Sequence, residues 1–399
     1  MRMWRIALVA VCLVTGASAQ TAKQFVRPLP GQTPPYNLGI KAGDVIYVSG
    51  QLPTDDKGNL VTGDITAQAT QVFANLRHVL QQAGSSLDNA VHATVMLQNA
   101  SDFPAVDQVY RQQFKGEPPA RTTIIGTMVR AGALIEIQVT AVPNGVPRKV
   151  ILPAGWVKPT SPYNYAIQAG DTLWMSGLVS RNGKDNSQVP GDIAVQAKTI
   201  MDNAGEILKA AGMSYGDLAT GRVALRDMAN FAAMNDVYRT YWEKDRPARV
   251  SCQAAPPGTF DLEITFMAIK GSQPRQVIIP PRADGTPGQA GPNFSPAIKV
   301  GNRLFISGGT GATADNGGDM KSQTTETLNR FGPALKAAGF DYKDIVSSDV
   351  YVTDVTKFND MNDSYRPFFP TDAPVRATVV IGRLGGPAAI VEIMVTAVK

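Results

Sequence analysis

Arginines recur at three places in this sequence, each as the last residue of a Pro-Ala-Arg or Pro-Val-Arg triplet. They are Arg121, Arg249 and Arg376. The planar guanidinium of arginine offers a carboxylate two parallel donors, which the ammonium of lysine cannot do. Each arginine is followed by a glutamate inside an otherwise apolar, alternating segment. These are Glu136, Glu263 and Glu392. An unpaired carboxylate in an apolar core is costly or has a raised pKa, so these glutamates either face solvent or line a polar cleft.

The arginines mark an internal repeat, because the interval from Arg121 to Arg249 is nearly equal to that from Arg249 to Arg376. Each arginine is preceded, at a similar distance along the chain, by a strand pattern that ends in Ser-Gly. The three serines are Ser49, Ser176 and Ser307. Solenoid repeats are far shorter than this period. The sequence therefore predicts three homologous domains, at residues 20–146, 147–273 and 274–399, which agrees with the two or three domains expected for 399 residues.

The first copy illustrates the elements expected in each domain. A β-branched run predicts a strand at 45–49, and Asp64 is a plausible N-cap for a helix whose apolar stripe stops at Gly84. The remaining patterns predict a strand, a helix and two strands, at 91–97, 103–114, 122–128 and 135–142. With a lead-in strand around Val26 the order is β-β-α-β-α-β-β. This is an α+β domain with helices on one face of a mixed sheet, whose other face the neighbouring copies must cover.

The Pro- and Gly-rich connections between copies repeat the lead-in strand. They contain the apolar segments 150–153 and 277–280, each after a basic residue. We therefore expect these linkers to double as the first strands of copies 2 and 3.

The N-terminus has the pattern of a secretory signal peptide, at residues 1–19. Arg2 and Arg5 precede an apolar run, and Ala17-Ser18-Ala19 forms a small-x-small cleavage pattern. The run is shorter than the roughly 20 residues that span a bilayer, so we expect no membrane anchor. Cleavage after Ala19 would release a periplasmic or secreted protein.

Composition and rare residues exclude several function classes. The formal net charge is +5, and it falls to +3 when cleavage removes Arg2 and Arg5, which predicts no nucleic-acid-binding face. The two histidines, His78 and His92, have no metal-ligand spacing, so no metal site is expected. Cleavage would also remove Cys12 and leave Cys252 alone, without an internal disulfide.

Each copy resembles the Rid/YjgF family of small imine deaminases, also known as the RidA or endoribonuclease L-PSP family. The third copy carries the C-terminal signature in full, at 374–384 and then Val391-Glu392-Ile393. The resemblance implies a chorismate-mutase-like fold. Family members are homotrimers with ligand clefts between subunits. Three copies in one chain therefore resemble a covalently linked pseudo-trimer, and the chain would act as a monomer.

The resemblance also implies a reaction and roles for individual residues. The reaction is hydrolysis of a 2-imino or enamino acid to a 2-keto acid and ammonia, without a cofactor. The arginines would bind the substrate carboxylate, and the glutamates would orient the attacking water. The further binding residues carried over from the family are Tyr36 and Tyr163 closing the cleft, Ser49, Ser176 and Ser307 at its floor, and Asn235 and Asn362 in the helix before the arginine.

The copies depart from the family pattern at four kinds of position. A family cysteine two residues after the arginine is replaced in every copy, by Thr123, Ser251 and Thr378. Phe294 stands for the cleft tyrosine in the third copy, and Asp107 stands for the helix asparagine in the first. In the second copy, Pro256-Pro257-Gly258 interrupts the signature. We therefore expect the three clefts to be inequivalent.

Other interpretations remain open at this point. An arginine and a glutamate on adjacent strands can be a structural ion pair. The same arginines also suit a non-catalytic protein that binds small carboxylates outside the cytoplasm. A ribonuclease, an activity attached by name to some relatives, is a third possibility, although the chain lacks a histidine acid/base pair.

Overall fold

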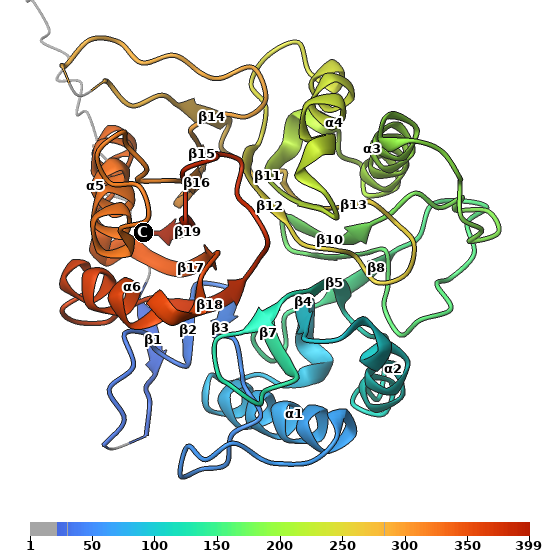
Figure 1. The fold of residues 1–399 in the computed structure, drawn as a ribbon. Coiled ribbons are helices and arrows are strands. Elements are labelled where there is room, and N and C mark those ends of the chain that lie inside the picture. The colour runs from blue at the N-terminus through green and yellow to red at the C-terminus, as the bar shows by residue number, and fades with distance from the viewer. Residues whose placement is uncertain (1–21, 30, 283) are drawn as a thin grey trace, which may run out of the picture.

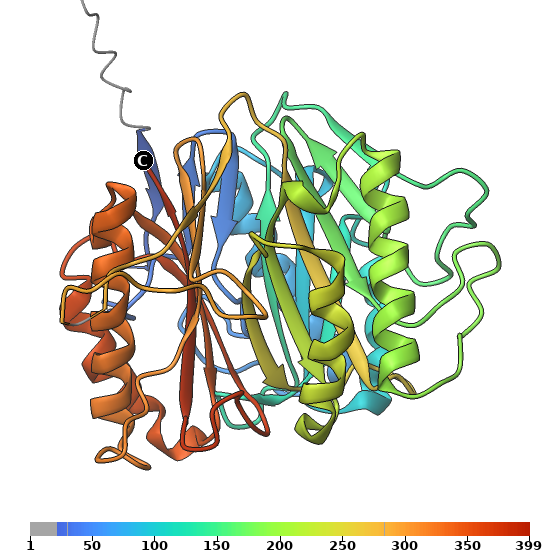
Figure 2. The same ribbon diagram turned by 90° about the horizontal axis from the view of Figure 1, so that it is seen from above.

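The computed structural model describes residues 22–29, 31–282 and 284–399. The predicted signal peptide, residues 1–19, lies outside these described residues. Figure 1 shows three lobes around a common centre, with the sheets facing inwards and the helices outside. Figure 2 shows the same layers from a direction turned by 90°.

The three copies have the same succession of elements, except that copy 1 has an additional short strand, β6. Copy 1 comprises β1 (Lys23–Val26), β2 (Gly39–Ala42), β3 (Val45–Val48), α1 (Ile65–Gln82), β4 (Ala90–Leu97), α2 (Phe103–Arg111), β5 (Ala120–Ile125), β6 (Thr127–Met128) and β7 (Ile135–Ala141). Copy 2 comprises β8 (Arg148–Ile151), β9 (Ala166–Ala169), β10 (Thr172–Leu178), α3 (Ile193–Ala210), β11 (Leu218–Leu225), α4 (Phe231–Tyr238), β12 (Ala248–Gln253) and β13 (Leu262–Ile269). Copy 3 comprises β14 (Arg275–Ile278), β15 (Ala297–Val300), β16 (Arg303–Gly309), α5 (Met320–Ala338), β17 (Ile345–Val352), α6 (Phe358–Tyr365), β18 (Val375–Val380) and β19 (Val391–Val398).

The α+β class, the threefold repetition and the lead-in strands are confirmed, but the predicted order lacks one strand per copy. The missing strand is β2, with its equivalents β9 and β15, which pairs with the lead-in strand and with the Ser-Gly strand. It has only four residues and directly precedes the turn at Gly43, where φ is +61°. Four residues are too few to show a clear alternation, so only the turn was visible in the sequence.

Helix α1 forms as its sequence pattern predicts. The side chain of Asp64 accepts a hydrogen bond from the backbone N–H of Ala67, which satisfies one free donor of the first turn. The apolar stripe, including Val72, Leu76 and Leu80, is buried against the sheet of copy 1.

In each sheet the arginine strand is the outermost strand of its own copy. In copy 1 the order is β1-β2-β3-β7-β4-β5, and copies 2 and 3 repeat it. β5 therefore lies against β10 of copy 2, β12 against β16 of copy 3, and β18 against β3 of copy 1. The ring is closed where β6 of copy 1 pairs with β18, which gives copy 3 a seventh strand.

The copies cover one another's inner sheet faces, as expected. Each copy has its own core between sheet and helices. A further buried cluster contains side chains from all three copies, including Met96, Val250 and Phe305. Because the inner sheet faces are enclosed, a ligand that contacts two copies must lie in a groove between neighbouring sheets.

Candidate active site

Each predicted arginine meets the predicted glutamate of the following copy. The pairs are Arg121 with Glu263, Arg249 with Glu392, and Arg376 with Glu136, and in each pair the arginine charge acts to lower the pKa of the glutamate. Within one copy, β4 lies between the arginine strand β5 and the glutamate strand β7. The interpretation as an ion pair on adjacent strands is therefore wrong. In the described part of the chain, none of these arginines forms an ion pair with a glutamate.

The predicted serines hold the arginine strands in place. The backbone N–H of Arg121 donates to the hydroxyl of Ser176 at 2.8 Å, and that hydroxyl donates to the carbonyl of Asn164 at 2.6 Å. Ser307 makes the equivalent two hydrogen bonds at Arg249, and Ser49 makes them at Arg376. All three serines are buried. Their hydroxyls thus bind the backbone of the arginine strand and of the neighbouring copy, and their expected part in binding substrate stays a prediction.

Aromatic rings surround each guanidinium. A tyrosine of the same copy lies under it, with 4.8–5.0 Å from the guanidinium carbon to the ring centre; these are Tyr110, Tyr238 and Tyr365. The ring predicted to close the cleft comes from the next copy, at 5.2–5.7 Å; these are Tyr163, Phe294 and Tyr36. Such contacts stabilise a desolvated cation. The members of the first set occupy the same helix position in every copy, and this recurrence is the signal by which they could be found in the sequence.

The three glutamates are buried, and burial raises the pKa of each to about 8. Glu263 accepts a hydrogen bond from the backbone N–H of Thr123 at 3.3 Å. Thr378 and Ser251 supply the equivalent backbone donors for Glu136 and Glu392. At neutral pH these side chains are therefore mostly uncharged carboxylic acids, which both donate and accept hydrogen bonds.

The glycine of each Ser-Gly pair makes room for the glutamate. A Cβ on Gly50, Gly177 or Gly308 would lie 1.8, 1.5 or 2.1 Å from the Oε1 atom of the glutamate in the same copy. A side chain at these positions would displace the carboxyl group from its place. The Ser-Gly motif thus serves two parts of the site, since its serine fixes the arginine strand and its glycine admits the carboxyl group.

The clefts differ in the residue that the preceding helix presents to the arginine. Asn362 accepts a hydrogen bond from Nη2 of Arg376 at 2.6 Å. Asp107 instead forms an ion pair with Nη1 of Arg121 at 2.7 Å.

In the cleft between copies 2 and 3, the helix residue makes no hydrogen bond to the arginine. The side-chain oxygen of Asn235 is buried and makes no hydrogen bond, and the three side-chain nitrogens of Arg249 have no acceptor in hydrogen-bond geometry, although the hydroxyl of Tyr238 lies close enough to raise the pKa of the arginine. Burial lowers the pKa of Arg249. Unpaired buried donors are costly, so this cleft favours an anionic ligand or a bound water. The clefts are therefore inequivalent, as expected, since the partner of the arginine guanidinium differs from one cleft to the next.

Replacing Asp107 by asparagine should strengthen anion binding in the cleft between copies 1 and 2. The change removes a carboxylate that competes with ligand for Arg121 and restores the residue type of the other copies. We expect roughly tenfold tighter binding of 2-oxobutyrate at one site per chain, measured by titration calorimetry, since about 1.4 kcal/mol corresponds to a factor of ten. Asp102→Asn, on the approach to the same helix, should have no effect. Unchanged or weaker binding by Asp107→Asn would show that Arg121 does not bind the ligand.

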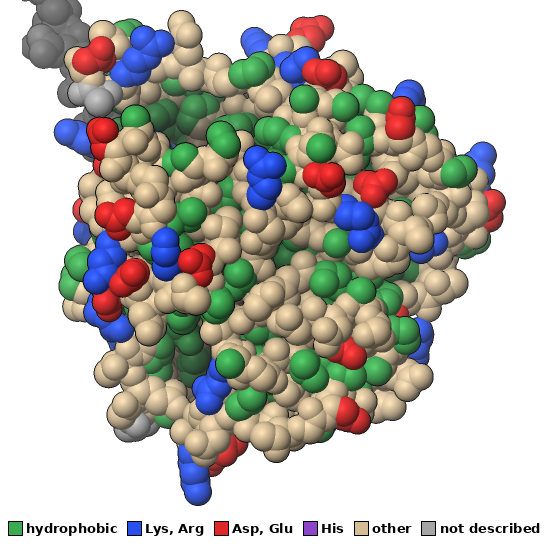
Figure 3. All heavy atoms as spheres, viewed as in Figure 1, with side chains coloured by type: hydrophobic (Ala, Val, Ile, Leu, Met, Phe, Trp, Pro, Cys, Tyr) green, Lys and Arg blue, Asp and Glu red, His purple; other side chains and the backbone are tan. Residues whose placement is uncertain are grey.

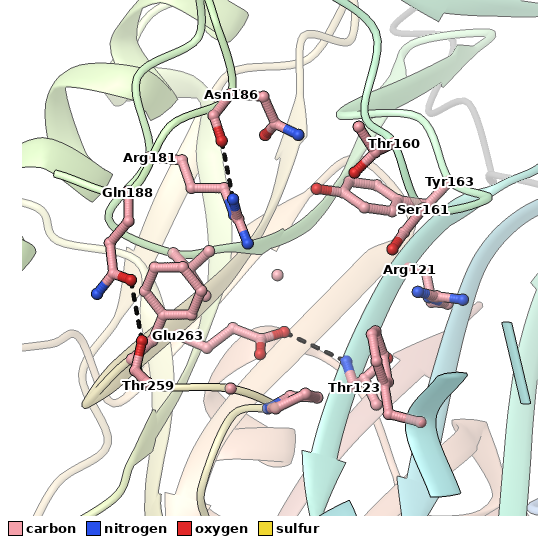
Figure 4. A pocket seen from close by; sticks show the side chains of 16 residues that line it. Arg121, Thr123, Thr160, Ser161, Tyr163, Arg181, Asn186, Gln188, Thr259 and Glu263 are labelled. Carbon is pink, nitrogen blue, oxygen red and sulfur yellow. Dashed lines mark hydrogen bonds between the residues drawn. The ribbon is translucent and has the colours of Figure 1, made fainter. Parts of the chain in front are cut away.

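A cavity of about 290 Å³ lies between copies 1 and 2. Figure 4 shows Arg121, Tyr163 and Glu263 around it. Its other lining residues are Phe103, Thr123, Thr160, Ser161, Gly177, Val179, Arg181, Asn186, Gln188, Pro257, Gly258, Thr259 and Phe260. Pro257 and Gly258, which interrupt the family signature, therefore form part of its wall. Arginine, an uncharged glutamic acid and a backbone N–H converge on a space large enough for a small acid and water.

Within the described residues, no group of three or more His, Cys, Asp or Glu side chains is arranged to hold a metal ion. Among the same residues, no helix combines the length and apolar character needed to cross a bilayer.

Comparisons with known proteins agree with the repeat. A model of the Endoribonuclease L-PSP family matches residues 28–143, 156–270 and 287–399. A RutC family protein of Saccharolobus solfataricus is 41% identical over 118 residues, which cover 29% of this chain and 94% of the relative. The 2-iminobutanoate/2-iminopropanoate deaminase of Mus musculus is 36% identical over 129 residues, covering 32% and 96%. The 3-aminoacrylate deaminase RutC of Acinetobacter baylyi is 40% identical over 114 residues, covering 27% and 90%.

Solved structures also match single copies. The Rid protein YyfA of Yersinia pestis is 36% identical and covers 30% of this chain and 99% of its own, with a TM-score of 0.29. The RutC family protein and the two deaminases each correspond in length to one copy, and the family model matches most of the chain in three successive segments. The chain therefore belongs to the Rid/YjgF, or Endoribonuclease L-PSP, family and contains three copies of its domain.

Proposed function

We propose that this protein hydrolyses small 2-imino or enamino acids to 2-oxo acids and ammonia in the clefts between its copies. The observation that carries the proposal is the convergence of Arg121 and Glu263, from different copies, on one cavity. Two of the relatives are named as deaminases of 2-iminobutanoate/2-iminopropanoate and of 3-aminoacrylate, which supports this choice of substrate class.

The arginine would bind the substrate carboxylate and fix the C=N carbon relative to a water molecule. The glutamic acid, neutral below pH 8, accepts a hydrogen bond from this water through its carbonyl oxygen. As the water oxygen bonds to C2, the C=N bond becomes a single bond. The carboxyl proton moves to the nitrogen, and one proton of the water passes to the glutamate, which restores the acid. The same transfer then repeats: the acid gives its proton to the amino nitrogen, the C–N bond breaks and ammonia leaves, and the hydroxyl group on C2 becomes the carbonyl as its proton returns to the glutamate. The sum is imine plus water giving 2-oxo acid plus ammonia, without a cofactor.

A coupled assay tests the proposal directly. An amino-acid oxidase generates iminopropionate from alanine, and the decay of the imine is followed with and without the full chain. We expect decay to accelerate in proportion to protein concentration. Decay at the uncatalysed rate would reject the deaminase proposal.

Non-catalytic binding of small carboxylates is the second candidate. The unpaired donors of Arg249 favour this function, because a bound anion would satisfy them whether or not a reaction follows. Unchanged imine decay together with calorimetric binding of 2-oxobutyrate would select this function.

Ribonuclease activity is not what the site supports best. Figure 3 shows basic and acidic side chains interspersed on the face seen in Figure 1, whereas nucleic-acid-binding surfaces gather basic residues. Burial also lowers the pKa of His92 to about 3, which removes it as a proton donor near neutral pH.

We further propose that the protein acts outside the cytoplasm, as a monomer whose three copies replace three subunits. The succession of charged, apolar and small residues within 1–19 supports export. The pairing of β6 with β18, which closes the ring within one chain, supports the monomer.

A further inference from the structure

The cavity between copies 1 and 2 has a second arginine, which the reaction described above does not use. Arg181 lies just beyond the C-terminal end of β10, and Figure 4 shows it across the cavity from Arg121. Its guanidinium carbon lies 4.9 Å from the ring centre of Phe260, and its Nη1 donates to the carbonyl of Asn186 at 2.8 Å. No carboxylate among the described residues forms an ion pair with Arg181. It therefore brings an uncompensated positive charge to this cleft.

The backbone around Arg181 is firmly held. Its N–H donates to the carbonyl of Val179 at 2.8 Å, and its own carbonyl accepts a hydrogen bond from Asn203 at 2.7 Å. Gly183, two residues on, packs so closely on Trp156 that an added Cβ would lie 2.2 Å from the indole. A residue on such a supported hairpin is positioned in advance of ligand binding.

This arginine is specific to copy 2. The equivalent residue of copy 1 is Thr54, which makes the same backbone hydrogen bond, to Leu52 at 2.8 Å, and likewise accepts from a helix asparagine, Asn75 at 2.9 Å. In copy 3 the residue five positions after the Ser-Gly serine is Ala312. The cleft of copies 3 and 1 has a different basic neighbour, the exposed Arg130, whose charge acts on Tyr36.

We propose that the cleft between copies 1 and 2 selects dicarboxylic 2-imino and 2-oxo acids, with one carboxylate at Arg121 and the distal carboxylate at Arg181. The cavity volume of about 290 Å³ is near the lower end of ligand pockets and exceeds what an acid of three or four carbons fills. A monocarboxylate can pair with only one of the two guanidinium groups, whereas a dicarboxylate offers one carboxylate to each. Asp107 occupies only Nη1 of Arg121, so its other donors remain for ligand. The uncharged form of Glu263 does not repel a second carboxylate. The inference rests on the proposed function for the orientation of the ligand at Arg121.

Titration calorimetry with the full chain tests this assignment, using 2-oxoglutarate and 2-oxobutyrate as probes. For Arg181→Gln we expect binding of 2-oxoglutarate to weaken about tenfold or more, while binding of 2-oxobutyrate stays unchanged. Lys184→Gln is the matched control, because it removes the same charge from an exposed position on the same hairpin. This control should affect neither probe. Thermal melting verifies that Arg181→Gln is folded.

The outcomes separate this assignment from the deaminase proposal. Loss of both probes in equal measure, loss of neither, or failure of the unaltered chain to bind 2-oxoglutarate would overturn the dicarboxylate assignment, whatever the imine assay shows. Selective loss of 2-oxoglutarate binding supports the assignment even if no imine is hydrolysed, in which case only the catalytic step has failed.

Discussion

The triple variant Arg121→Met, Arg249→Met and Arg376→Met should lose at least about a hundredfold of the imine deaminase rate. Each guanidinium lies among aromatic rings in its cleft, and two charge-assisted hydrogen bonds to a carboxylate are worth roughly 1.5–3 kcal/mol each. Methionine keeps an unbranched side chain that packs against the surrounding rings. Replacing a buried charge by an apolar side chain of similar size is often tolerated by the fold. The measurement is the coupled assay with iminopropionate, at saturating and at limiting substrate.

The control is the triple variant that carries lysine at the same three positions. Lysine retains the positive charge but not the planar pair of donors, so we expect a partial loss of activity, mainly as a raised KM. Both variants must melt cooperatively near the temperature of the unaltered chain. Full activity in the folded methionine variant would mean that the arginines take no part in binding substrate.

Replacing Glu263 by glutamine should stabilise the protein at pH 8 and have little effect at pH 5. The folded protein holds the pKa of Glu263 near 8, because burial disfavours the charged form, whereas the unfolded chain has the ordinary value of 4.5. A raised folded pKa means that the favourable contribution is complete below pH 4.5 and is lost as the pH rises through 8. The destabilisation at pH 8 amounts to roughly 3–5 kcal/mol, at about 1.4 kcal/mol per pKa unit. Glutamine has the same shape and an oxygen that accepts from Thr123.

Calorimetric melting from pH 5 to pH 8 measures this effect. We expect the melting temperature of Glu263→Gln to exceed that of the unaltered chain by several degrees at pH 8, with the difference vanishing towards pH 5. Glu206→Gln, at an exposed position of the same copy, should leave the curve unchanged. A constant difference across this range would show that Glu263 titrates normally and does not reach the reaction as a neutral acid.

The same residues show what could be predicted from the sequence and what could not. Arg121 and Glu136 were identified because their types are unusual in their surroundings and because they recur. Their pairing was not accessible, because Arg121 meets Glu263 through the packing of whole copies rather than through any spacing along the chain. For the same reason the sequence suggested an ion pair within one sheet, which β4 excludes.

Arg181 was missed for a different reason. It occurs in one copy only, so a search for recurring residues passes over it. The signal that could have found it is the difference between otherwise matching hairpins, in which a threonine and an alanine stand at its position in the other copies. The serines were found, but not their part in the site, because their bonds to the arginine backbone depend on how neighbouring sheets abut.

The pairing of Met128 with Val379 joins the first lobe to the last, so the circle is completed by one polypeptide. In a trimer of identical subunits the three grooves would be identical, because every substitution would occur in all three subunits. Here each substitution occurs once, and its effect falls on the groove or grooves that its own copy helps to build. Asp107 and Arg181 both belong to the groove between copies 1 and 2, so these two residues can alter ligand binding there without altering the other two grooves. The assembly also persists at any dilution, since no encounter between molecules is needed to form it.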